Sequence, residues 1–64
     1  MKYTNSQIEK IIDEYIHSER NRKILKRRYI DGIHIEALAE EFDLSSKQIK
    51  NILKKDGDYI FLHL

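Results

Sequence analysis

Residues 35–53 read IEALAEEFDLSSKQIKNIL, and this stretch decides the fold. Its apolar residues recur at the spacing of amphipathic helices, with a polar corner at residues 43–45. The pattern predicts two helices, over residues 35–42 and 46–55, that pack against each other. Ala39 stands where two helices that cross at a steep angle need a small side chain. We therefore expect a helix-turn-helix with a core of Leu38, Ala39, Phe42, Leu44, Ile49, Ile52 and Leu53.

The residues before this unit predict two more amphipathic helices. Isoleucines and Tyr15 recur at helical spacing over residues 6–17, after the capping side chains of residues 4–6. A second helix is expected over residues 20–30, where Ile24, Leu25 and Tyr29 form one side. Asp31-Gly32 is its stop signal, because Gly accepts the left-handed backbone that often ends a helix.

The end of the chain predicts a different structure. Asp56-Gly57 should end the last helix, since Gly can take a positive φ. Residues 59–64 read YIFLHL, which is rich in aromatic and β-branched residues, so residues 58–64 predict a short extended or β tail. Residues Tyr59 to Leu64 could pair with a second copy as an antiparallel ribbon or fold back over the first helix, and we favour the homodimer. The fold class is therefore all-α, with four short helices and this tail.

Composition narrows the choice of function. The chain has 64 residues, so we expect a single domain over residues 1–64. The absence of Cys excludes disulfides, zinc fingers and thiol chemistry, and fits a cytoplasmic protein. No apolar run approaches the roughly 20 residues of a membrane span, so we expect no membrane contact. His17, His34 and His63 are too scattered to suggest a metal site, and we expect no cofactor.

Charge is distributed in blocks although the net charge is only +1. Residues 19–30 carry a net charge of +5 and residues 45–64 a net charge of +2. Residues 1–18 carry −1 and residues 31–44 carry −5. Such a polarised surface can bind a polyanion despite a small total charge.

From Arg20 to Leu53 the chain reads RNRKILKRRYIDGIHIEALAEEFDLSSKQIKNIL. In this register it resembles the C-terminal promoter-binding domain of bacterial sigma-70-type factors, which reads the −35 element. The resemblance implies a helix-turn-helix that binds promoter DNA. A chain of this length leaves no room for the polymerase-binding domain of a complete sigma factor. We therefore expect a stand-alone regulator similar to sigma region 4, of the kind found on phages and mobile elements.

Three positions depart from the family pattern. Asp43 replaces the usual Gly at the helix corner, although Asp tolerates a left-handed backbone better than most residues. Arg27 replaces an apolar residue, which favours a solvent or phosphate role for that side of the helix. The ending DGDYIFLHL replaces the usual basic end of the last helix.

The main functional hypothesis is sequence-specific binding of double-stranded DNA by a small transcriptional regulator. Amide and lysine side chains on residues 46–55 suit the major groove. The expected base contacts are Ser46, Lys47, Gln48, Lys50 and Asn51. The expected phosphate contacts are Arg20, Arg22, Arg27, Arg28, Ser45, Lys54 and Lys55.

The alternative hypothesis is a sigma-like protein-interaction module that engages RNA polymerase or another regulator. The acidic residues Glu36, Glu40 and Glu41 and the low net charge favour it. The simpler interpretation of these glutamates is solubility and a favourable position for Glu36 near a helix N-terminus. An enzyme is not expected, because no pattern in so small a chain organises a catalytic pocket.

Overall fold

Four helices account for the secondary structure of residues 4–62, the part of the chain that the computed structural model describes. They are α1 (Asn5–Tyr15), α2 (Glu19–Tyr29), α3 (Ile35–Phe42) and α4 (Ser46–Leu62). The expected all-α class is confirmed for these residues, and the expected bounds of the first three helices hold to within two residues. The fourth helix is longer than expected.

Side chains just before α1 and α2 explain where these helices begin. Thr4 accepts a hydrogen bond from the Gln7 N–H at 3.2 Å, and the Gln7 side chain accepts one from the Thr4 N–H at 2.8 Å. This reciprocal pair is a capping box, which satisfies two backbone donors at the start of α1. Ser18 caps α2 by accepting from the Asn21 N–H at 3.3 Å.

Left-handed residues end α3 and shape the connection that follows α2. Gly32 has a φ of +71°, as the sequence predicts. Asp43 ends α3 with φ 56° and ψ 47°, so this residue adopts the left-handed backbone that was expected at the corner. The Leu44 N–H then donates to the Ala39 carbonyl at 2.9 Å, which satisfies an acceptor that the end of the helix exposes.

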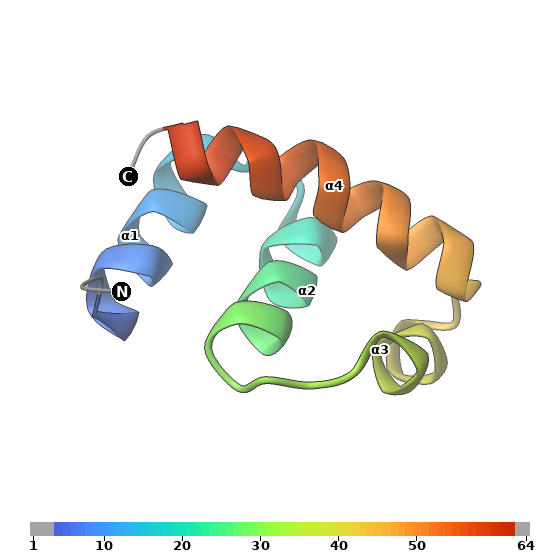
Figure 1. The fold of residues 1–64 in the computed structure, drawn as a ribbon. Helices are drawn as coiled ribbons and strands as arrows, with labels where there is room; N and C mark the ends of the chain where they lie inside the picture. Colours follow the sequence, from blue (N-terminus) through green and yellow to red (C-terminus); the bar gives the residue numbers. More distant parts are fainter. Residues whose placement is uncertain (1–3, 63–64) are drawn as a thin grey trace.

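Helix α4 crosses all three other helices and lies along one side of the molecule (Figure 1). Its 17 residues give a length of about 25 Å at about 1.5 Å per residue. That is most of the longest dimension of the molecule, 29 Å. Helix α4 therefore spans the molecule and packs against α1, α2 and α3, while α2 also packs directly against α1 and α3.

Two core clusters meet along α4. The first contains the buried residues Ile12, Ile16, Leu25 and Ile60, and the second contains Ile24, Leu38, Ala39 and Ile49. Leu53 packs against both clusters, so it joins them into one continuous interior. The expected core of residues 35–53 is confirmed: the members that are not fully buried, Phe42, Leu44, Ile52 and Leu53, pack against the second cluster.

The extended tail is wrong for residues 58–62, because α4 continues through them to Leu62. Ile60 is 1% exposed and packs among residues of α1 and α2, so helical continuation buries a large apolar side chain. Tyr59 and Phe61 make edge-to-face contacts with Tyr15 and Tyr29, with ring centroids 5.8 and 5.7 Å apart. The segment therefore folds back over α1, and the antiparallel ribbon does not form over these residues. His63 and Leu64, the rest of the predicted tail, lie outside the described residues.

Gly57 does not end α4 as expected, but allows α2 and α4 to approach closely. It is buried inside the helix, and a Cβ atom there would collide with the Tyr29 hydroxyl oxygen. The helix thus accepts a Gly at a local cost of about 1 kcal/mol because the tertiary contacts on either side outweigh it. Burial raises the pKa of Tyr29 above its ordinary value.

None of the helices within residues 4–62 has both the length and the apolar character needed to cross a membrane.

Substitution of Gly57 tests the close approach of α2 and α4. We expect Gly57→Ala to lower the free energy of unfolding by about 1 kcal/mol, because overpacking at Tyr29 costs about 1–3 kcal/mol and better helix propensity offsets about 1 kcal/mol. In a Tyr29→Phe background the colliding oxygen is absent, so the same substitution should stabilise the protein. Chemical denaturation of the wild type, the two single variants and the double variant measures both effects. Equal effects of Gly57→Ala in the two backgrounds would contradict the assigned contact.

Candidate nucleic-acid interface

The first half of α4 presents an uninterrupted set of exposed polar and basic side chains. Ile49 is completely buried, and Ile52 and Leu53 are half-buried, so the core sets the rotation of the helix. The exposed residues of this half are Lys47, Gln48, Lys50, Asn51, Lys54 and Lys55. Residues 45–55 contain four lysines and no acidic residue, whereas residues 56–62 contain two aspartates and no cation.

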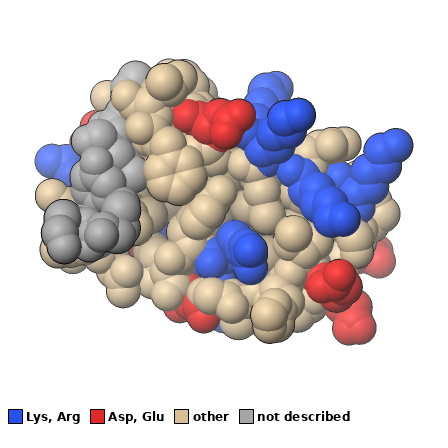
Figure 2. Space-filling view, in the orientation of Figure 1, with Lys and Arg blue, Asp and Glu red and all other residues tan. Residues whose placement is uncertain are grey.

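The outermost line of α4 is Lys47, Asn51, Lys54 and Asp58. At 3.6 residues per turn these positions lie opposite Ile49 and Ile60, and all four are exposed. Figure 2 shows basic surface gathered over the first half of α4, at the upper right of the view, with acidic surface further along the same helix. The basic surface of α4 therefore ends before its C-terminal half begins.

The start of α4 is held by a capping box between Ser45 and Gln48. The Gln48 N–H donates to the Ser45 hydroxyl at 3.1 Å, and the Ser45 N–H donates to the Gln48 side-chain oxygen at 2.9 Å. The two residues were expected to contact phosphate and a base, and the structure gives both a local structural role. Ser46, another expected base contact, is half-buried and lies off the outermost line.

Arg27 forms ion pairs with two carboxylates. Its guanidinium lies 3.1 Å from a Glu41 oxygen on α3 and 3.1 Å from an Asp31 oxygen in the loop after α2. The hydrogen bond to Glu41 raises the pKa of Arg27 above its ordinary value, and Asp31 adds to this effect. The expected phosphate contact at Arg27 would have to displace these carboxylates, so the geometry favours a role in joining α2 to α3.

Other cations of α2 also bond within the protein. Arg22 donates to the His17 carbonyl at 3.1 Å, and Arg28 donates to the Ile33 carbonyl at 3.2 Å. Lys26 lies 2.8 Å from an Asp13 carboxylate oxygen on α1. Two expected phosphate contacts, Arg22 and Arg28, are therefore half-buried and bonded to backbone carbonyls. Although α2 carries the highest positive charge in the sequence, much of that charge holds neighbouring segments.

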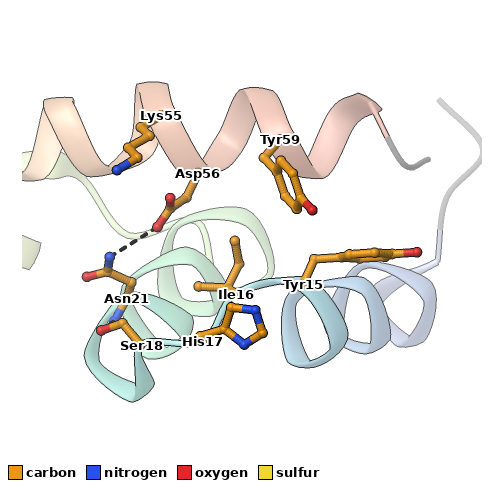
Figure 3. Close-up of a pocket in the computed structure, with 8 residues that line it drawn as sticks. All are labelled: Tyr15, Ile16, His17, Ser18, Asn21, Lys55, Asp56 and Tyr59. Atoms are coloured by element: carbon orange, nitrogen blue, oxygen red, sulfur yellow. Dashed lines mark hydrogen bonds between the residues drawn. The ribbon is translucent and has the colours of Figure 1, made fainter.

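Arg20 is the expected phosphate contact of α2 that is exposed. Its neighbour Asn21 donates to the Asp56 carboxylate of α4 at 3.1 Å, which places the start of α2 beside the middle of α4 (Figure 3). A shallow cleft of about 310 Å³ adjoins this bond, between Tyr15 on α1 and Tyr59 on α4. Lys55 and Asn21 both line this cleft. Arg20 donates a hydrogen bond from Nε to the Asn21 side-chain oxygen at 3.3 Å, so it lies next to a residue that contacts α4.

The structure thus brings together five expected contacts on the exposed part of α4: Lys47, Lys50, Asn51, Lys54 and Lys55. It separates Arg27 and Arg28 from them, because these arginines lie at the opposite end of α2 from Asn21 (Figure 1). Sequence reasoning missed the role of Asp58, which limits the basic line of α4. The sequence does contain the pattern that would reveal this role: Asp58 follows Asn51 and Lys54 at helical spacing if the helix continues past Gly57.

The capping box at Ser45 has a measurable consequence. We expect Ser45→Ala to lower the free energy of unfolding by about 1 kcal/mol, because the N–H of the first turn loses its acceptor. Ser46→Ala is the matched control and should change it by less, since Ser46 is not the capping residue. Thermal or chemical denaturation measures both variants. A larger loss at Ser46 than at Ser45 would contradict the assigned cap.

Comparison with protein-family models, with curated proteins and with solved structures found no match to this chain.

Proposed function

We propose that the chain is a sequence-specific double-stranded DNA-binding protein that regulates transcription. In this proposal α3 and α4 form a helix-turn-helix, and the first half of α4 enters the major groove. The observation that carries it is the set of exposed lysines and an exposed amide on a helix whose opposite side is fixed in the core. A major groove about 12 Å wide admits such a helix.

The proposed contacts divide into two kinds. Lys47, Lys50 and Asn51 are near the start of α4 and can reach base edges. Lys54, Lys55 and Arg20 are the exposed cations that best suit phosphate, because they lie further along α4 and at the adjoining start of α2. This set is smaller than the sequence predicts, since Arg22, Arg27 and Arg28 bond within the protein.

The order of the helices supports the resemblance to sigma region 4. The resemblance does not extend to the end of the chain. Residues 35–53 have the helix, corner and helix that this family implies. Residues 56–62 add an acidic and apolar half to α4, in place of the usual basic ending. We propose a stand-alone cytoplasmic regulator of the phage or mobile-element type, with residues 1–64 as one DNA-binding domain and with no cofactor or enzymatic activity.

The alternative function is a protein-interaction module that engages RNA polymerase. Glu36 and Glu40 favour it, because they lie one turn apart on α3 and are both exposed, whereas Glu41 pairs with Arg27.

A second copy of the chain is a further proposed partner, through the exposed side chains Tyr59, Phe61 and Leu62. A DNA-binding dimer of this kind would select two half-sites related by twofold symmetry.

Charge reversal on α4 tests the proposed function. We expect Lys50→Glu to weaken binding to a selected duplex about tenfold or more, because it places a carboxylate against the groove. Lys10→Glu is the matched control, since Lys10 is an exposed lysine of α1 and the change in net charge is the same. Fluorescence anisotropy at fixed salt measures both. Equal weakening would contradict a specific role for α4, and a chain that binds polymerase but no duplex would support the alternative.

The salt dependence of binding tests which cations contact phosphate. We expect Lys54→Gln to reduce the slope of log affinity against log salt by about 0.9, the value for one lost phosphate contact. Arg27→Gln should leave the slope unchanged, because this guanidinium is held by Glu41 and Asp31. Titrations at several salt concentrations give the slopes. A reduced slope for Arg27→Gln and none for Lys54→Gln would reverse the assignment.

A further inference from the structure

We infer that Asn51 selects an adenine in the DNA site and that Gln48 does not read bases. This inference rests on the proposed function, which it deepens by naming the base and the residue that recognises it. Helix α4 carries two amide side chains, Gln48 and Asn51, and both are exposed. Either residue type can form a bidentate pair with adenine, so the sequence alone does not separate them.

The geometry at the start of α4 separates them. The Gln48 side-chain oxygen accepts a hydrogen bond from the Ser45 backbone N–H at 2.9 Å. The Gln48 backbone N–H donates to the Ser45 hydroxyl at 3.1 Å. A bidentate pair with adenine needs this same amide as both acceptor and donor, directed away from the helix start. Base contact by Gln48 would therefore break the capping box, and the Ser45 N–H would lose its acceptor within the protein.

Asn51 has the opposite environment. It is exposed, and its side chain makes no hydrogen bond within residues 4–62. It lies on the outermost line of α4, with Lys47 one turn before it and Lys54 one turn after it. Its amide is therefore free to point into a groove while the two lysines approach guanine acceptors or phosphates on either side.

Asp58 sets the end of the contact. It is the next residue on the same line and is exposed, so its carboxylate would face phosphate if the helix entered the groove that far. The part of this line that suits DNA therefore runs from Lys47 to Lys54, and Asn51 is at its centre. A short side chain must be near the centre of the contact to reach a base edge.

The chemistry of the line then points to adenine. The Asn51 side-chain oxygen can accept from the adenine N6 amino group while its NH₂ donates to N7. The lysines on this line carry donors alone, so they cannot make this pair. Asn51 is accordingly the residue on this line that can select adenine, whereas the lysines favour guanine, whose major-groove edge presents two acceptors.

Selection from a random duplex library tests the inference with three proteins: wild type, Asn51→Ala and Gln48→Ala. We expect the wild type to select a motif that contains a required adenine. Asn51→Ala should lose the preference at that one position and keep the rest of the motif. Gln48→Ala should keep every preference while melting at a lower temperature, because it loses the capping box. Circular dichroism confirms that each variant is folded.

A modified duplex then separates direct recognition from an indirect effect. Replacement of the required adenine by 7-deaza-adenine removes the N7 acceptor. We expect it to weaken wild-type binding by about 5-fold or more and to leave Asn51→Ala binding unchanged. If the wild type selects a motif but Asn51→Ala keeps every preference, or Gln48→Ala loses one, the adenine assignment is overturned and the proposed function stands. If the wild type selects nothing, both are overturned.

Discussion

The packing of α4 against the other three helices is the constraint on which the rest of the structure depends. Ile49 and Ile60 are buried in different core clusters, about three turns apart on the same side of this helix, and Leu53 contacts both clusters. A small domain buries little surface, so one element that closes two clusters contributes a large share of the interior. The same contacts fix which side of α4 faces outward, and the proposed function depends on that rotation.

Charge in this protein has two roles that the net value of +1 conceals. The cations of α2 hold the molecule together: Lys26 pairs with Asp13 on α1, and Arg27 joins Glu41 on α3. These pairs are exposed enough that each contributes little stability, but together they orient three helices. The lysines of α4 form no ion pair within residues 4–62, so they remain available to an external anion. Carboxylates of α1, α3 and the loop after α2 therefore pair with cations of α2, whereas no carboxylate of residues 4–62 pairs with a lysine of α4.

Much of the fold could be predicted from local patterns. The spacing of Leu38, Ala39 and Ile49 predicted their burial, and the tolerance of Asp for a left-handed backbone predicted the corner at Asp43. Gly57 was misread because a helical Gly and a terminating Gly have the same local sequence, and the contact with Tyr29 that distinguishes them joins distant segments. The pattern YIFLHL suits a strand, but the burial of Ile60 against α1 outweighs that local preference.

The exposed residues of the candidate site could be predicted less completely. The helical periodicity placed Lys47, Asn51 and Lys54 on the outside, as the structure does. It could not show that Arg27 meets Glu41, because that pair depends on how α2 and α3 pack. The capping role of Gln48 was visible in the sequence as a Ser followed three residues later by a Gln, which is a capping-box signature as well as a potential base contact.

Chemical-shift mapping tests the central claim most directly, because it reports which amides of a protein this small respond to a ligand. The measurement is a titration of the isotope-labelled chain with a mixed-sequence DNA duplex at low salt. The account predicts that the largest shifts occur at residues 45–55, with smaller shifts at the start of α2. Shifts confined to α3, which carries the exposed Glu36 and Glu40, or no shifts at all, would contradict the proposed DNA contact.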